Sequence, residues 1–344
     1  MENVMQFNVL LILLFSLVLS ACQTTQSSVT AETQSKLPAQ IRSSPLLNAY
    51  DFHIIDPQSQ NRLTIPQLAQ QLADFDVIFI GEFHGNHASH LLETQLLTAL
   101  WQNHPEQVIT MEMFNRDQQS SLNRYLDSEI GEVYFTKNTP TWQNYVAGYR
   151  PIIEFAKQNF IPVIAANAAA DTVRCIGREG KTYIDKLKAD QKAHLAEQPF
   201  MDNADYRKKY MDFLEEARKI PEEAKEKSYL AQLSRDNTMA ESIYIAYMEN
   251  PQAQIIHFNG SFHSEDHLGT VSALKARQSN LNIAVITPVA IEDPSQPSVS
   301  DKELKSGDYI YLLQSQPEQY QDASYRQKSH QAMFKRASEA TCNP

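Results

Sequence analysis

The fold of this chain is decided by two similar stretches, Val77-Ile78-Phe79-Ile80-Gly81-Glu82-Phe83-His84 and Ile255-Ile256-His257-Phe258-Asn259-Gly260-Ser261-Phe262-His263. Each is a short apolar run that stops at a glycine, with a histidine three residues later. An apolar run of this length predicts a buried β-strand. Because ligands bind at the carboxyl ends of parallel strands in an α/β sheet, we expect the two Gly-x-x-His turns to meet at one site.

Apolar runs and helical patterns alternate along the chain. The patterns predict a hairpin at 51–65, strands at 77–80, 108–113, 161–166, 254–258, 283–286 and 309–312, and helices at 87–101, 118–126, 141–158 (broken at Arg150-Pro151) and 235–248. Strands separated by helices imply an α/β fold, with a mostly parallel sheet flanked by helices. Residues 180–230 are rich in charge and predict an inserted helical subdomain, either a lid over the ligand edge or a solvated helical hairpin.

The composition limits the classes of partner that the chain can bind. The chain has 344 residues, of which 42% are hydrophobic, so it can bury a sizeable core. Its formal net charge is −11, whereas binding to the nucleic-acid backbone needs a basic surface. We therefore expect no nucleic-acid partner.

The N-terminus is typical of a targeting segment. An uncharged apolar run at 9–19 leads into Leu19-Ser20-Ala21-Cys22, which resembles a bacterial lipoprotein cleavage box. The resemblance implies a signal peptide at 1–21 and a lipidated Cys22, whose palmitate and other acyl chains anchor the protein to a membrane. Gln23 in place of Asp favours the outer membrane of the cell envelope. No Lys or Arg precedes the apolar run, so an ordinary secretory peptide with an incidental cysteine is the alternative.

Three further regions follow the signal peptide. Residues 22–44 are rich in Gln, Ser and Thr and predict a flexible tether, residues 45–315 the α/β domain, and residues 316–344 a mobile C-terminal tail. Cys175 and Cys342 could pair in an oxidising compartment, although nothing in the sequence places them close together.

Histidines and carboxylates gather around the two glycine turns. We expect His84, His263 and Glu82 to hold a divalent metal, or His84 and His263 to polarise water with Glu82 or Glu112 as the base. Glu112 lies inside an apolar strand and must be paired there, either in the site or with Arg116, Arg150 or Arg235. His87 and His90 are expected to be exposed helix residues.

Two other segments have both a structural and a functional interpretation. Arg235-Asp236 opens the last long helical pattern, so Asp236 could cap that helix, while Arg235 could pair with a site carboxylate or a bound one. Trp142, Tyr145 and Tyr149 share one helical face. Such a stripe usually packs in a core, but a phenolate can also bind ferric haem and aromatic walls suit a porphyrin.

Taken together, five motifs resemble the ChaN family of haem-binding, iron-regulated lipoproteins, which shares a superfamily with Tiki, TraB and erythromycin esterase-like proteins. The motifs are Gly81-Glu82-Phe83-His84, Met111-Glu112-Met113-Phe114, the Trp142 to Pro151 segment, Arg235-Asp236-x-x-Met239-Ala240, and His257 to His263. They occur in order over roughly residues 50–312, within the ChaN-like domain.

This resemblance implies a haem-binding lipoprotein that serves iron or haem acquisition. It implies Tyr149 as the iron ligand, with Tyr145 as the second choice. His87 or His194 is implied as a further haem contact, and Arg235 as another cofactor-binding residue. A homodimer around haem and an outer-membrane haem receptor are the implied partners. The Tiki and esterase branches imply the alternative, a divalent-metal-dependent hydrolase that uses Glu82, His84, Glu112 and His263.

Overall fold

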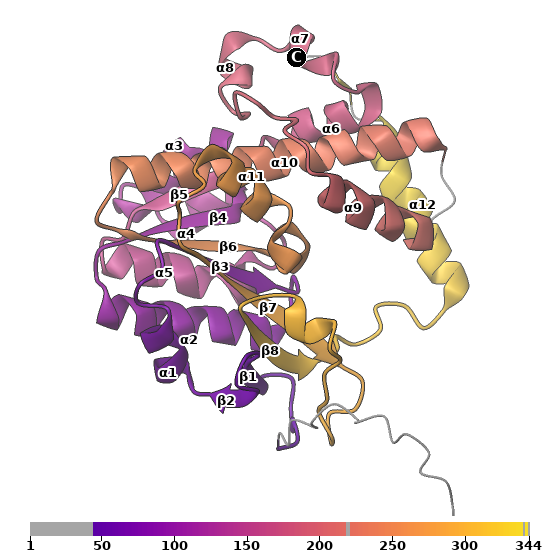
Figure 1. The fold of residues 1–344 in the computed structure, drawn as a ribbon. Helices are drawn as coiled ribbons and strands as arrows, with labels where there is room; N and C mark the ends of the chain where they lie inside the picture. Colours follow the sequence, from indigo (N-terminus) through magenta and orange to yellow (C-terminus); the bar gives the residue numbers. More distant parts are fainter. Residues whose placement is uncertain (1–43, 218–220, 340, 343–344) are drawn as a thin grey trace, which may run out of the picture. The chain divides into compact units, whose positions relative to one another are not determined.

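One eight-stranded sheet organises the described part of the chain, residues 44–217, 221–339 and 341–342 of a computed structural model (Figure 1). The strands are β1 (Phe52–Asp56), β2 (Asn61–Leu63), β3 (Val77–Glu82), β4 (Gln107–Asn115), β5 (Val163–Asn167), β6 (Gln254–Gly260), β7 (Ile283–Ile291) and β8 (Tyr309–Gln314). Their order is β2-β1-β8-β7-β3-β6-β4-β5. Strand β1 runs antiparallel to β2 and β8, and the other neighbours are parallel. The predicted α/β class is confirmed.

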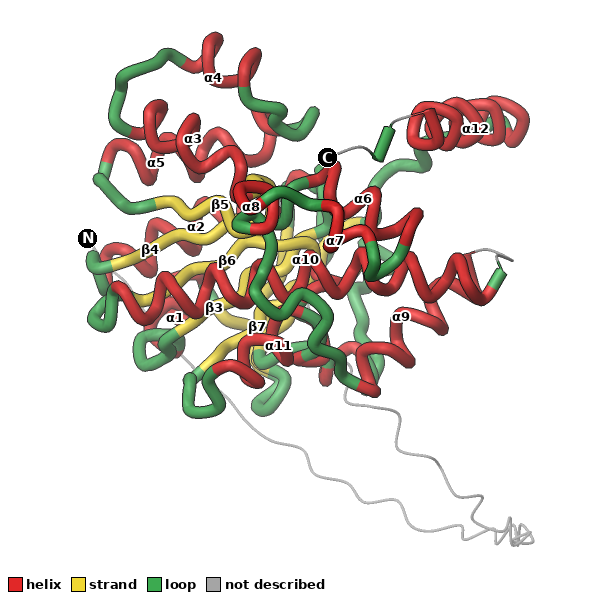
Figure 2. The backbone as a smooth tube through the Cα atoms, turned by 90° about the horizontal axis from the view of Figure 1, so that it is seen from above, coloured by secondary structure: helices red, strands yellow, loops and turns green. Residues whose placement is uncertain are grey.

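Helices cover both faces of this sheet. The helices of the described residues are α1 (Ile65–Gln71), α2 (His87–Asn103), α3 (Gln119–Leu126), α4 (Glu132–Asn138), α5 (Arg150–Gln158), α6 (Ala170–Glu179), α7 (Tyr183–Lys186), α8 (Ala189–Lys192), α9 (Ala204–Ala217), α10 (Glu222–Glu249), α11 (Thr270–Arg277) and α12 (Ala323–Glu339), and not all of them lie on the sheet. Alternate residues of β3 point to opposite faces, so Ile78 and Ile80 pack with α1, α2, α3 and α5, while Val77 and Phe79 pack with α10 and α11. Figure 2 shows α10 and α11 crossing over the strands.

The register of the two central strands places the glycine turns side by side. Strands β3 and β6 are parallel neighbours, with Gly81 opposite Asn259 and Glu82 opposite Gly260. Both Gly-x-x-His turns therefore leave the same edge of the sheet, as the sequence predicts.

Helix α10 begins earlier than the sequence pattern indicates. It starts at Glu222 rather than near Arg235, so Arg235 and Asp236 lie in the middle of a 28-residue helix. The prediction that Asp236 could cap a helix is wrong, because its side chain is buried inside the molecule. Likewise Ile65, expected at the end of the hairpin, begins α1 after the capping residue Thr64.

The charged insertion consists of α7, α8, α9 and the first half of α10. Helix α9 packs on α10, and the phenol of Tyr206 in α9 reaches the middle of α10. The insertion is therefore more than a solvated hairpin, since it contributes a side chain to the interior.

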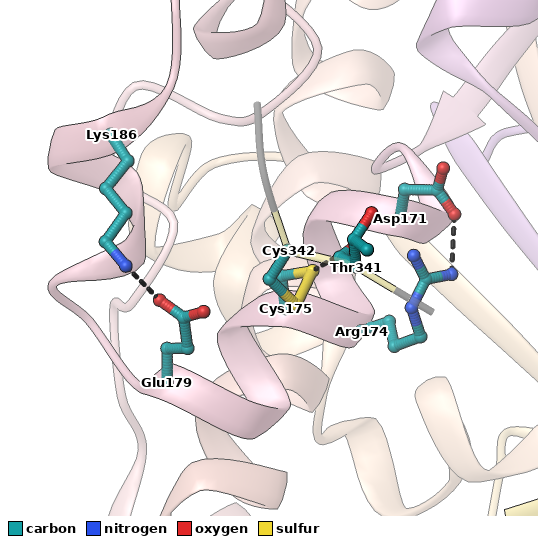
Figure 3. Close-up of a disulfide and its surroundings, with 7 residues drawn as sticks. All are labelled: Asp171, Arg174, Cys175, Glu179, Lys186, Thr341 and Cys342. Atoms are coloured by element: carbon teal, nitrogen blue, oxygen red, sulfur yellow. Dashed lines mark hydrogen bonds and ion pairs between the residues drawn. A yellow bond between two sulfur atoms is a disulfide. The ribbon is translucent and has the colours of Figure 1, made fainter. Parts of the chain in front are cut away.

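The segment expected to be a C-terminal tail contains α12 and ends in a disulfide. Cys342 is bonded to Cys175 of α6, with their Cα atoms 5.5 Å apart (Figure 3). The predicted signal peptide, Cys22 and the tether up to residue 43 lie outside the described residues. Among those that are described, no helix has the length and apolar character needed to cross a membrane.

Candidate functional site

Four elements bring the candidate residues together at one edge of the sheet. Glu82 is the last residue of β3 and His84 follows it by two. Glu112 lies in β4, His263 ends a short 3-10 turn after β6, and Asp236 reaches in from α10. The site is thus assembled from distant parts of the chain at the carboxyl ends of parallel strands, where such folds bind ligands.

Glu82 and His84 form a carboxylate–imidazole pair. The Nδ1 of His84 donates a hydrogen bond to Oε1 of the buried Glu82, while 43% of the His84 side chain is exposed. Burial alone would raise the pKa of Glu82, but hydrogen bonds from His84 and His90 lower it to about 2. A carboxylate held on Nδ1 orients an imidazole and leaves Nε2 available, as a general base requires.

The His84 ring rests against Gly260. A Cβ atom at this position would lie 2.6 Å from Nε2 of His84, so a glycine is required for the two turns to approach each other. The pKa of His84 is shifted above its usual value, because the carboxylates of Glu82 and Glu112 outweigh the effect of burial.

His263 lies between two buried carboxylates. Its Nδ1 donates to Oδ1 of Asp236 at 2.7 Å, and its Nε2 lies 3.4 Å from Oε1 of Glu112. Burial would lower the pKa of His263, but Glu112 and Asp236 raise it to about 10. The pKa of Glu112 is held well below its usual range, since His263 and the Gly260 amide outweigh burial. Glu112 therefore pairs with His263 rather than with an arginine: Arg116 pairs with Glu241.

Asp236 is itself held by side chains that sequence reasoning missed. Tyr206 donates to its Oδ2 at 2.7 Å, and Thr270 donates to its Oδ1 at 2.8 Å. Gly269, with φ +55°, brings the backbone against the same carboxylate. No local pattern marks Tyr206, because its role depends on how the insertion packs against α10.

A second cluster lies beneath the exposed turn at 83–85. His90 and Glu93 of α2 are both buried, so the expectation of an exposed His90 is wrong. The Nδ1 of His90 donates to Oε2 of Glu93 at 2.9 Å and lies 3.0 Å from Oε2 of Glu82. Asn86 caps α2 by accepting from two backbone amides, and this cap turns the first residues of the helix toward Glu82.

The two tyrosines expected to ligate haem iron are buried. Tyr149 donates to Oε1 of Glu82 at 2.6 Å, and burial together with this carboxylate raises its pKa well above the usual value. Tyr145 is also enclosed, its hydroxyl has no hydrogen-bond partner, and burial raises its pKa. Both belong to a π-helical turn, Tyr145–Tyr149, a feature often found at functional sites. Neither offers a phenolate to a ligand in this arrangement.

The remaining expected contacts are more accessible. His87 is exposed at the start of α2 and stacks on Tyr50, with ring centroids 5.1 Å apart. Arg235 is half-buried on α10 and forms no ion pair within the described residues. His194 is half-buried in the insertion and is not joined to the site by a hydrogen bond or ion pair in the described part of the chain.

A groove of about 810 Å³ opens beside the site. Phe83, Phe213 and Phe262 line it together with Lys208, Lys209 and Lys302. Lys208 pairs with Asp212, and Lys209 pairs with Glu265 and Asp266, so the groove combines an aromatic wall with mixed charge. Phe83 is followed directly by the turn that carries His84, which joins the groove to the histidine site.

The chain matches one family model and several solved structures. The family model, described as haem-binding uptake, Tiki superfamily, ChaN, matches residues 68–274. A structure of ChaN from Campylobacter jejuni, described as showing cofacial haem binding, is 20% identical with a TM-score of 0.57, covering 79% of this chain and 100% of that one. An erythromycin esterase mutant, EreC, is 12% identical with a TM-score of 0.46, covering 77% and 98%. No curated protein matches the chain.

Proposed function

Because this chain belongs to the haem-binding ChaN family of the Tiki superfamily, we propose that it binds haem as a cell-envelope protein that serves iron or haem acquisition. The family match carries the proposal, since it spans residues 68–274 and so includes both glycine turns and α10. The C. jejuni structure supports the shared fold.

The edge of the sheet offers what a porphyrin needs. A porphyrin is a flat apolar ring that binds aromatic walls, and its iron takes an axial imidazole or phenolate. The groove beside the site supplies Phe213 and Phe262, and the residues that follow its Phe83 include the half-exposed His84 and, at the start of α2, the exposed His87. Arg235, which lacks an ion pair in the described region, could hold a carboxylate of the bound group.

Among the expected iron ligands, we propose His87 first. Its ring is exposed, whereas Tyr149 would have to leave its hydrogen bond to Glu82 and lose a proton that burial retains. Tyr145 faces the same obstacle. The two tyrosines remain candidates only if the π-helical turn opens on binding.

A haem titration followed by absorbance tests this proposal. We expect a saturable Soret band with the purified protein, and a weaker or spectrally shifted complex with His87→Ala. The matched control is His330→Ala, at an exposed histidine of α12 beside Tyr320. Non-saturating binding would contradict the proposal, and a phenolate-type spectrum that disappears in Tyr149→Phe would show that the tyrosine is the ligand.

We also propose where the protein is located and which partners it has. A lipid anchor at Cys22 would hold the protein to the envelope, and Gln23 after it favours the outer membrane. The Cys175–Cys342 disulfide supports an oxidising compartment, since such bonds persist outside the reducing cytosol. A second copy of the chain around haem and an outer-membrane haem receptor are the partners we propose.

A hydrolase is the second candidate, because one observation favours it. The Glu82–His84 pair places a half-exposed imidazole next to Glu112 and His263, an arrangement of acid–base groups that hydrolysis of a substrate by water would use. A survey of ester and peptide substrates would test it, with His84→Gln expected to abolish any hydrolysis and His87→Ala to leave it intact. Hydrolysis that persists in His84→Gln would exclude this site.

A further inference from the structure

Three side chains of metal-ligating type are buried together beneath the turn at 83–85. Glu82 ends β3, and His90 and Glu93 lie on the first two turns of α2. The side chains of both glutamates are completely buried, and that of His90 is 7% exposed. One ligand atom from each lies within 4.8 Å of the others.

The two carboxylates of this trio lack sufficient partners. Oε1 of Glu82 accepts from His84 and Tyr149, whereas its Oε2 has only the Nδ1 of His90, at 3.0 Å, and that nitrogen also donates to Glu93. Oε1 of Glu93 has no partner, and in the described chain neither carboxylate is paired with a lysine or arginine. Glu93 has only the imidazole of His90 as a cationic partner and shares it with Glu82, so a further positive charge between the two carboxylates would stabilise the cluster, because an uncompensated buried carboxylate is costly.

The spacing suits a cation in that place. Two ligands at about 2.1 Å from a metal ion and at right angles to each other are about 3.0 Å apart. Nδ1 of His90 lies 3.0 Å from Oε2 of Glu82 and 2.9 Å from Oε2 of Glu93. One imidazole with two carboxylates, and no thiolate, is a donor set for Mn²⁺, Fe²⁺ or Zn²⁺.

One hydrogen bond must change when the cation binds. The amide of Gly85 donates to Nε2 of His90 at 3.2 Å, whereas coordination through Nδ1 places the ring proton on Nε2. Gly85 is exposed and has φ +78°, so its amide can turn toward water at small cost.

We propose that Glu82, His90 and Glu93 bind one divalent cation of the Mn²⁺, Fe²⁺ and Zn²⁺ class. This site shares Glu82 with the metal site expected from the sequence, but it takes His90 and Glu93 in place of His84 and His263. The bound cation neutralises the trio and fixes the Glu82 carboxylate that orients His84. The proposal does not depend on haem binding.

Mn²⁺ is the probe for the test. The purified protein is stripped with a chelator, dialysed against Mn²⁺, and analysed for metal content and thermal stability. We expect about one equivalent of Mn²⁺ and a higher melting temperature, because an ion that binds only the folded state stabilises it. Electron spin echo modulation of the bound Mn²⁺ should detect one coordinated imidazole nitrogen.

Three variants locate the ion. Glu93→Gln keeps the size of the side chain and should weaken Mn²⁺ binding about tenfold or more. His330→Gln, at an exposed histidine of α12 outside both sites, should bind Mn²⁺ as the wild type does. The nitrogen signal should persist in His84→Gln.

The proposal is overturned by any of three results. The first is the absence of stoichiometric Mn²⁺ in the wild type, which would mean that a proton shared by Glu82 and Glu93 neutralises the cluster. The second is unchanged affinity in folded Glu93→Gln. The third is loss of the nitrogen signal in His84→Gln, which would place the ion at the glycine turns and decides the question even if Glu93→Gln does not fold.

Discussion

At the scale of single residues, His263 links the two halves of the site. Its imidazolium neutralises part of the charge of Asp236 and Glu112, which come from α10 and β4. The raised pKa of His263, about 10, expresses this coupling. His263 therefore holds α10 and β4 together at this edge of the sheet.

Replacing His263 should strongly destabilise the folded protein at neutral pH. His263→Gln leaves two buried carboxylates without their cation, so we expect a loss of about 3–5 kcal/mol in the free energy of unfolding. His267→Gln is the control, because its ion pair with Asp308 is exposed and is worth about 0–1 kcal/mol. Denaturant unfolding measures both, and equal losses would contradict the account.

The difference in stability between the wild type and His263→Gln should depend on pH. The folded-state pKa of His263 lies above its usual value, so its contribution is complete below about pH 6.5 and is lost as the pH rises toward 10. The stability gap between wild type and His263→Gln should therefore narrow by about 1.4 kcal/mol per pH unit across this window. A gap that is constant from pH 6 to 10 would show that His263 is not charged in the folded protein.

Two glycines allow a matched comparison. A Cβ at Gly148 would lie 2.7 Å from Nε2 of the buried His90, and one at Gly260 would lie 2.6 Å from Nε2 of the half-exposed His84. His84 can move into solvent, but His90 cannot. We expect Gly148→Ala to cost about 1–3 kcal/mol and Gly260→Ala less, with the ring of His84 displaced in the latter. Thermal melts and histidine NMR shifts would report both, and the reverse order of stability would refute this packing argument.

Position along a strand was the most informative feature of the sequence at the residue scale, because both Gly-x-x-His turns leave the same edge of the sheet. His84 and His263 meet because each follows a glycine at the end of a parallel strand. The burial of His90 could not be predicted, because its spacing on a helix does not say which neighbour covers it, whereas the core packing of Tyr149 was one of the two interpretations of its aromatic stripe. His90 and Glu93, near the start of a helix, also give the same sequence pattern whether their side chains are buried or exposed.

At the scale of elements, α10 shows which features local sequence patterns predict and which they miss. The helical period near Arg235 is correct, but the helix begins at Glu222, inside the charged insertion. A buried aspartate in mid-helix then resembles a capping residue, since both are polar residues next to an apolar pattern. Only the contacts of Asp236 with His263 and Tyr206 distinguish them.

The C-terminal segment gives the testable prediction at the scale of elements. The Cys175–Cys342 disulfide closes a loop across a sequence separation of 167 residues and fastens the end of α12 to α6. Removing it frees the unfolded chain, so Cys342→Ser should lower the free energy of unfolding by about 2–4 kcal/mol. Denaturant unfolding with and without reductant tests this, and a wild type insensitive to reductant would argue that the bond does not form.

At the scale of the whole molecule, alternation of strands and helices was enough to predict the sheet and the edge that carries the site. The strand order required tertiary information, because β3 pairs with β6 and β7 from distant parts of the chain. The pairing of two cysteines this far apart was likewise beyond any local pattern.

The envelope anchor is a whole-molecule prediction. Three cysteines are present, and the disulfide uses two of them, which leaves Cys22 for lipidation. Expressed in bacteria, the wild type should incorporate labelled palmitate and sediment with membranes, whereas Cys22→Ser should do neither. Labelling that survives in Cys22→Ser would contradict the lipoprotein assignment.

The central claim is that haem binds at the carboxyl edge of the sheet, beside the two Gly-x-x-His turns. Anomalous diffraction at the iron absorption edge, from crystals of the haem-loaded protein, tests it most directly. The account predicts an iron peak at the turn that carries His84 and His87, within bonding distance of the His87 imidazole. An iron peak on another face of the molecule would contradict the account.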